Sequence, residues 1–291
     1  MLNLQRTRRQ RTLARAVGVT GHGYWTGEKV RVEFRPAPEC TGIVFVRGDL
    51  PQPARIPAVA AARIEIPRRT VLEHGPARVE MVEHALAALA GLQIDNCEIW
   101  LDRQELPGLD GSSQDYVDAL TWAGVCAQQA PRAQLVISEV IRLGDEQSWI
   151  EARPAAGPGL SLRYVLDYGP RGPIGRQIKQ IQLCPRIFRE ELAACRTFLL
   201  REEAEWLMAQ GLGRRATLRD LLVFDTEGPV ENTLRFPDEC VRHKLLDMVG
   251  DLALAGCDLV GHVTAHRSGH RLNAELVSHL LARPPALRRS A

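Results

Sequence analysis

The sequence contains no long apolar run and no paired cysteines, and both absences limit what the protein can be. No stretch approaches the roughly 20 apolar residues of a membrane-spanning helix, and no signal-peptide core follows the basic N-terminus. The seven cysteines are odd in number and scattered, without a Cys-x-x-Cys pair. This pattern disfavours a disulfide framework and a thiolate metal site. We therefore expect a soluble, cytoplasmic protein without a membrane span.

Signals for nucleic acid and for a phosphate-binding loop are also weak. The formal net charge is only +2, which is too nearly balanced for nucleic acid to be the expected partner. The glycines at 18, 21, 23 and 27 do not form a Gly-x-Gly-x-x-Gly motif that opens a helix, and no Walker lysine and serine follow them. A glycine-rich turn between strands is the better interpretation.

The chain is long enough for two domains, with 291 residues of which 45% are apolar and 25% charged. A short polar interruption at residues 130–132 predicts a boundary, giving domains 1–130 and 131–291. Hydrophobic periodicity predicts an α+β protein. Expected strands lie within 12–50 and at 97–101, 134–142, 149–152, 160–167 and 257–265. Expected helices are 79–92, 113–124, most of 185–211 with a break around 196–198, 242–251 and 273–281.

One pattern occurs in both halves of the chain. His84 lies near the start of an apolar helix that ends at Gly91 and leads into a strand, and His243 begins a similar helix that ends at Gly256 before another strand. This repetition predicts two copies of one α+β unit facing each other, with the two histidines at their interface. Small-molecule sites often form at such interfaces.

The second of these helices carries three polar residues on one stripe. His243, Asp247 and Asp251 follow at intervals of four, and apolar residues such as Leu245 and Val249 fill most of the remaining surface. Buried charges need partners. In isolation the pattern is more typical of an exposed or capping histidine with a solvated carboxylate, so a metal site depends on partners elsewhere in the chain.

If His84 meets His243 and Asp247, the three form a two-histidine, one-carboxylate zinc site with a position open for water. The adjacent Glu83 is then placed to take the proton of the attacking water. The same ligand types also describe the facial triad of non-haem iron enzymes, so they do not exclude iron. A lone His84 could also be an ordinary core or capping histidine.

His270, which follows Gly269 at the end of a predicted strand, supplies a second acid/base group. As an imidazolium it could stabilise an oxyanion and protonate a leaving amine, and Asp251 is positioned to keep it charged. The alternative for His270 alone is a polar loop residue.

Several separated segments together resemble a known family, the UDP-3-O-acyl-N-acetylglucosamine deacetylases, which are zinc amidases of lipid A biosynthesis. The resemblance covers most of the chain and rests on residues 35–38, 81–96, 109–112, 195–198, 234–236, 241–247 and 268–270. It implies two stacked domains, each a sheet with helices on its inner face, with the active site between them. It also implies a monomer that acts on a small-molecule substrate.

The resemblance assigns roles to individual residues. Zinc is held by His84, His243 and Asp247, while Glu83 is the general base. The acid/base set is completed by His270, Asp251 behind it, and Thr197 as a hydroxyl donor to the oxyanion. Substrate contacts are implied for Lys244, Arg267 near the diphosphate, Tyr168 against the uracil, Phe198 and Gly269.

The chain departs from the family pattern in regions that shape substrate binding. Trp25 stands where the family has a histidine, and Leu199 stands where it has a glycine. Arg214-Arg215 occupy a segment that is glycine-rich in the family. One alternative is therefore a divergent paralogue that deacetylates another N-acetylated sugar. A second is a catalytically silent sugar-nucleotide binding protein, although such a binder has no need of Glu83 and His270.

Overall fold

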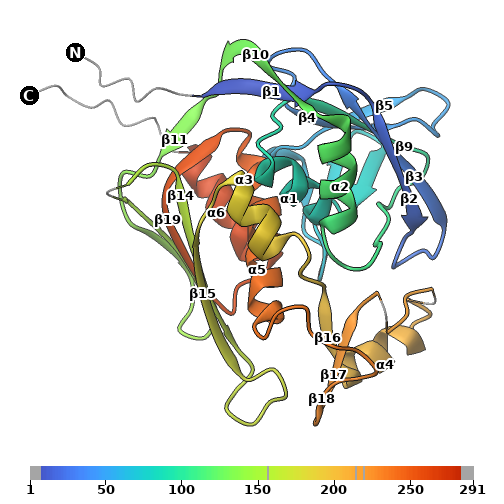
Figure 1. Cartoon of the computed structure of the whole chain (residues 1–291), viewed down its shortest axis with the longest axis vertical. Helices are drawn as coiled ribbons and strands as arrows, with labels where there is room; N and C mark the ends of the chain where they lie inside the picture. The colour runs from blue at the N-terminus through green and yellow to red at the C-terminus, as the bar shows by residue number, and fades with distance from the viewer. Residues whose placement is uncertain (1–7, 156, 214, 219, 283–291) are drawn as a thin grey trace, which may run out of the picture.

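The computed structural model describes residues 8–155, 157–213, 215–218 and 220–282, and most of its helices lie between two β-sheets (Figure 1). Across the first sheet the strands are β2 (Val17–His22), β3 (Lys29–Pro36), β9 (Cys97–Leu101), β4 (Ile43–Arg47) and β5 (Ala54–Pro57). Strand β3 illustrates why the sheet has an apolar face. Its Val30, Val32 and Phe34 are buried and alternate with more exposed residues.

The second sheet has the same arrangement. Its strands are β12 (Ile141–Gly144), β13 (Trp149–Arg153), β19 (Asp258–His266), β14 (Leu160–Asp167) and β15 (Arg176–Gln182), with β11 (Gln134–Val136) also paired to β19. In both sheets the central strand pairs antiparallel on one side and parallel on the other, and an antiparallel hairpin partner completes each edge.

In each half, one helix precedes the central strand of the sheet and another helix follows it. The first half contributes α1 (Glu83–Gly91) before β9 and α2 (Gln114–Ala123) after it. The second contributes α5 (Glu239–Leu252) before β19 and α6 (His270–Ala282) after it. The α+β class and the predicted repeat of one unit are therefore confirmed, and the helices lie on the inner faces of the two sheets (Figure 1).

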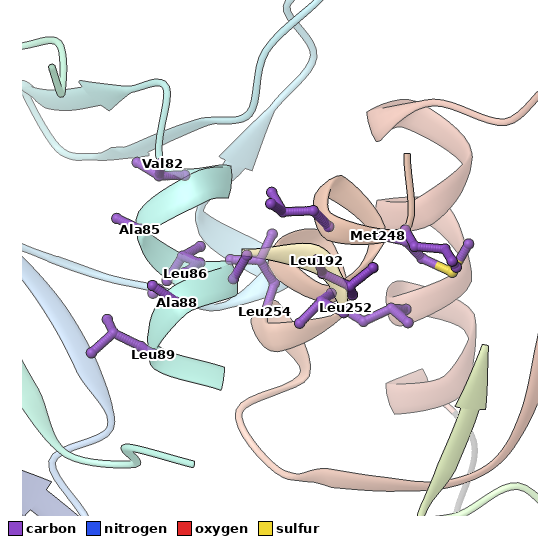
Figure 2. Packing of buried hydrophobic residues seen from close by; sticks show 14 of the residues in the cluster. Val82, Ala85, Leu86, Ala88, Leu89, Leu192, Met248, Leu252 and Leu254 are labelled. Atoms are coloured by element: carbon purple, nitrogen blue, oxygen red, sulfur yellow. The ribbon is translucent and has the colours of Figure 1, made fainter. Parts of the chain in front are cut away.

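The two units pack through α1 and α5, and Gly250 permits their close approach. A Cβ at that position would lie 2.1 Å from the carbonyl oxygen of Glu83, so a side chain cannot be accommodated without moving one helix. Figure 2 shows Leu86 on the side of α1 toward Leu254, whereas Leu89 points the opposite way. These leucines are buried, so α1 is apolar nearly all round, as expected for a helix inside a protein.

Smaller elements complete the fold. They are β1 (Arg9–Leu13) with β10 (Val125–Pro131), the sheet of β6 (Arg63–Ile64), β7 (Val71–His74) and β8 (Ala77–Glu80), α3 (Pro185–Ile187) with a π-helical turn (Phe188–Leu192), and the 3-10 turns Ala60–Ala62 and Ala253–Ala255. A further unit, called here the outer segment, comprises β16 (Phe198–Leu200), α4 (Arg201–Ala209), β17 (Leu222–Asp225) and β18 (Gly228–Pro229). It projects at one end of the molecule (Figure 1).

Several predicted boundaries were wrong because pairing with distant strands overrides local periodicity. Residues 79–80 belong to β8, so the first long helix begins only at Glu83. The predicted helical stretch 185–211 contains β16, and the predicted strand 134–142 is two strands. The final helix begins at His270, not at residue 273.

The proposed domain boundary falls at the end of a strand that the sequence did not predict. Strand β10 pairs antiparallel with β1, in a register that joins Arg9 to Pro131. The division into 1–130 and 131–291 remains a prediction. Within the described part of the chain, no helix is both long and apolar enough to cross a membrane.

Candidate active site

Three metal-ligand side chains converge near the crossing of α1 and α5. His84 comes from the second residue of α1, and His243 and Asp247 lie one turn apart on α5. Each offers a donor atom within 4.8 Å of the others. Oδ1 of Asp247 lies 3.5 Å from Nε2 of His84 and 3.3 Å from Nε2 of His243. The structure thus brings the predicted metal set together in a buried position, while its role as a ligand set stays a prediction.

The protonation states of His243 and Asp247 suit metal binding. Nδ1 of His243 lies 3.0 Å from the carbonyl oxygen of Cys195, which favours a hydrogen on Nδ1 and leaves Nε2 as the ligand atom. Burial lowers the pKa of His243 to about 4, so the ring is neutral at neutral pH. Burial by itself raises the pKa of the Asp247 carboxyl group. The nearby His243 and Lys244 outweigh this effect and hold that pKa well below its usual range. Nζ of Lys244 lies 2.7 Å from Oδ2 of Asp247.

Glu83 is adjacent to the metal set but points into a different network. It is the first residue of α1 and is only 2% exposed. Its Oε2 accepts the backbone N–H of Thr70 at 3.0 Å. Burial raises the pKa of Glu83, although nearby His270 and His84 oppose that change. A carboxylate with a raised pKa in this position is suited to accept a proton from a reacting group.

His270 is held by a buried carboxylate. Its Nδ1 lies 2.8 Å from Oδ2 of Asp251. Asp251 also accepts hydrogen bonds from the hydroxyl of Thr70 at 2.6 Å and from Nδ2 of Asn273 at 2.8 Å. Burial by itself lowers the pKa of His270, but Asp251 outweighs it and raises the pKa to about 9. His270 therefore carries a positive charge at neutral pH. Thr70 and Asn273 were missed by sequence reasoning, and the only available signal was the i, i+3 spacing of Asn273 from His270.

Thr197 lies next to the proposed ligand atom of His243. Its Oγ1 is 3.2 Å from Nε2 of that histidine and donates to the carbonyl oxygen of Gly111 at 3.1 Å. The neighbouring Arg196 makes a buried ion pair with Glu239, with Nε and Oε1 2.9 Å apart. This pair joins the Thr197 loop to the start of α5, so it sets where Thr197 stands relative to His243. Sequence reasoning did not assign a role to either member.

A cavity of about 930 Å³ opens beside these polar groups. Glu83, His84, His243, Asp247 and His270 line part of it. The outer segment and the loop that follows α4 contribute apolar side chains, among them Leu199, Leu207, Met208, Leu221, Val223 and Val230. A site with a polar group of residues and a large apolar wall suits a ligand that has both a polar head and an apolar chain.

Four of the five predicted substrate-binding residues also line this cavity, namely Lys244, Tyr168, Phe198 and Gly269. The rings of Tyr168 and Phe198 are 6.0 Å apart, and Nζ of Lys244 lies 5.8 Å from the centre of the Phe198 ring. Arg267 is exposed and is not among the described residues that form the cavity wall. Its backbone is in the left-handed region, at φ 48°, and its part in substrate binding stays a prediction.

The departures from the family pattern also lie mostly at the cavity. Trp25 and Leu199 both line it. The indole Nε1 of Trp25 lies 3.2 Å from Sδ of Met81, and the guanidinium of Arg69 lies 4.1 Å from the ring centre. Of the two adjacent arginines, 214 is outside the described residues and Arg215 is exposed.

Comparison with known proteins identifies the family. The model of the UDP-3-O-acyl N-acetylglycosamine deacetylase family matches residues 10–282. The chain is 37% identical to the UDP-3-O-acyl-N-acetylglucosamine deacetylase of Myxococcus xanthus (strain DK1622), over 94% of this chain and 87% of that protein. It is 39% identical to the protein of the same name from Anaeromyxobacter dehalogenans (strain 2CP-C), over 96% and 89%, and 37% identical to that of Pasteurella multocida (strain Pm70), over 96% and 92%. The chain belongs to the UDP-3-O-acyl N-acetylglycosamine deacetylase family.

Proposed function

We propose that this protein is a zinc-dependent deacetylase that removes the N-acetyl group of UDP-3-O-acyl-N-acetylglucosamine and releases acetate, a step of lipid A biosynthesis. The observation that carries the proposal is the convergence of His84, His243 and Asp247 beside Glu83 and His270, at the wall of a cavity with a large apolar part. The seven cysteines of the protein are free, which supports action in a reducing compartment such as the cytoplasm.

The chemistry of the donor set fits zinc. Two imidazoles and one carboxylate are the protein ligands of many catalytic zinc sites, in which a fourth position is open for water. When bound, zinc polarises the amide carbonyl and lowers the pKa of the attacking water. The carbonyl of Cys195 that receives Nδ1–H of His243 supplies the outer contact such ligands usually have.

The surrounding residues divide the proton transfers. Glu83, with its raised pKa, takes the proton of the attacking water as general base. His270, charged because of Asp251, delivers a proton to the nitrogen that leaves as an amine. The hydroxyl of Thr197 turns from Gly111 to the developing oxyanion, a contact worth roughly 3 kcal/mol at comparable sites.

The cavity supports a substrate with an acyl chain. Leu199, Leu207 and Val223 offer apolar surface to such a chain. Lys244 and Tyr168 lie at the same cavity and provide a cation and a ring for a nucleotide. The names of the relatives describe a substrate with both parts.

The test is an amine-release assay that compares acylated UDP-N-acetylglucosamine with its non-acylated form. We expect a strong preference for the acylated compound, and loss of nearly all turnover in Glu83→Gln with about one equivalent of zinc retained. Preference for the non-acylated compound would favour the divergent paralogue, for which Trp25 and Leu199 in the cavity wall are the supporting observation. Full activity in Glu83→Gln would refute the assignment of the base.

A further inference from the structure

Helix α4 contacts β16 and β17 within the outer segment, but its side toward the cavity faces no other described helix or strand so closely. Every one of its residues is exposed or half-buried, in contrast to α1 and α5. Its Ala204, Leu207 and Met208 line the cavity, so they face space and not a protein core. An amphipathic helix derives most of its stability from packing of its apolar face. The ion pair of Arg201 with Asp225 joins α4 to β17, so a further contact from the first half of the chain is what would hold the helix against the cavity when no ligand fills it.

Arg68 provides a contact to α4 from the other side of the cavity. It belongs to the loop between β6 and β7, in the first half of the chain, and lines the same cavity as α4. Its Nη2 lies 3.2 Å from Oε1 of Glu203, and its Cζ lies 5.8 Å from the centre of the Trp206 ring. Both contacts are on α4. Glu203 is itself fixed, because its Oε2 accepts the backbone N–H of Leu200 at the start of the helix.

We propose that Arg68 is a positioning residue that holds α4 against the cavity and so keeps Leu207 and Met208 in place for the acyl chain of the substrate. The identity of that chain rests on the proposed function, whereas the role of Arg68 does not. Arg68 and Glu203 are 39% and 35% exposed. Ion pairs of this exposure are weak, so the contact can open and close during each substrate exchange while still favouring the closed position.

The consequence for binding follows from preorganisation. Without Arg68, α4 spends more time away from the cavity. Binding of the acyl chain must then order the helix before that chain gains contacts with Leu207 and Met208. The apparent affinity for the acylated substrate equals the intrinsic affinity multiplied by the fraction of molecules in which the apolar wall is complete. A substrate that lacks the chain does not use this wall, so its binding is independent of Arg68.

The structure offers a closely matched control. Arg35 makes the same two types of contact, with Nη2 2.6 Å from Oε2 of Glu33 and Cζ 4.2 Å from the centre of the Trp100 ring. Its side chain is 40% exposed, nearly the same as that of Arg68. These contacts lie within the first sheet and not across the cavity. Arg35→Ala therefore removes an equivalent surface charge and stacking contact without touching α4.

The first measurement is amide hydrogen exchange of the full-length protein over residues 201–209. We expect exchange about fivefold faster in Arg68→Ala, from loss of the ion pair and the stacking contact. Exchange of this segment in Arg35→Ala should equal that of the wild type. Equal exchange in all three proteins would overturn the proposal, because Arg68 would then be an ordinary surface residue. This readout needs no substrate.

The second measurement is the KM of the same proteins for acylated UDP-N-acetylglucosamine. We expect KM about fivefold higher in Arg68→Ala, with kcat and the activity toward non-acylated UDP-N-acetylglucosamine unchanged. A lower KM would show that the contact obstructs entry and would overturn the proposal. Faster exchange with an unchanged KM would overturn the link to the acyl chain. Lack of wild-type activity on both compounds would refute the proposed function, and the exchange data would still decide the role of Arg68.

Discussion

From the ion pair between His270 and Asp251 we predict the pH above which activity declines. Asp251 raises the pKa of His270 to about 9 against the opposing effect of burial, whereas an unperturbed histidine has a pKa of about 6.5. His270 acts in its charged form, so activity should be retained up to its pKa and decline above it. At pH 8 a group of pKa about 9 is about 90% protonated, and one of pKa about 6.5 is about 3% protonated.

Asp251→Asn tests this reasoning with little change in shape. The amide can donate to the hydroxyl of Thr70 on one side and accept from His270 and Asn273 on the other, which keeps the positions of the present hydrogen bonds. The negative charge is lost, so the pKa of His270 should fall to its ordinary value or below it, because burial now acts alone. We expect kcat/KM about 30-fold lower at pH 8, and a difference that narrows as the pH approaches 6.

The assay is the pH dependence of kcat/KM, together with histidine NMR to titrate His270 directly. Asn273→Ala is the control, because it removes one hydrogen bond to Asp251 and leaves the charge. We expect that variant to keep most of the pKa elevation. An alkaline limb that remains near pH 9 in Asp251→Asn would refute the assigned role of the pair, provided that zinc content and melting temperature match the wild type.

Three further perturbations test the framework around the site. Gly250→Ala places a Cβ 2.1 Å from the carbonyl of Glu83 and should destabilise the fold by about 3 kcal/mol, measured by urea unfolding. Arg196→Ala leaves the buried carboxylate of Glu239 without its ion-pair partner and should cost about 3–5 kcal/mol; an unchanged unfolding midpoint would contradict this. His243→Ala should lose bound zinc in elemental analysis, and chelation of the wild type should abolish activity, with recovery on adding zinc back.

Features that depend on local periodicity were predictable from the sequence. The helix containing His243 and Asp247 is visible from its apolar residues and its i, i+4 spacing. The repeat of the two halves was apparent from a histidine, a helix, a glycine and a strand in the same order, and the shared sheet topology confirms it. That repeat is what suggested that His84 meets His243, and their rings are 5.2 Å apart.

Features that depend on contacts between distant segments could not be predicted. The sequence predicted a break in a helical stretch around residues 196–198 but not strand β16, because its partner β17 lies more than twenty residues later in the chain. Thr70 reaches Asp251 from a loop 181 positions away in the sequence, and no spacing rule joins them. The same applies to Arg68 and Glu203, which come from different halves and have no local signal.

The two halves share a topology but contribute unequally to the site, and the helix crossing explains how. Helix α1 provides Glu83 and His84 from its first turn, and α5 provides His243 and Asp247 from two successive turns. Gly250 lies three residues after Asp247 and directly against the backbone of Glu83. The absence of a side chain at this one position therefore sets how near the base of one half comes to the ligands of the other. A change at residue 250 should disturb the distance between His84 and Asp247 although it removes no polar group, so zinc affinity should fall in Gly250→Ala together with stability.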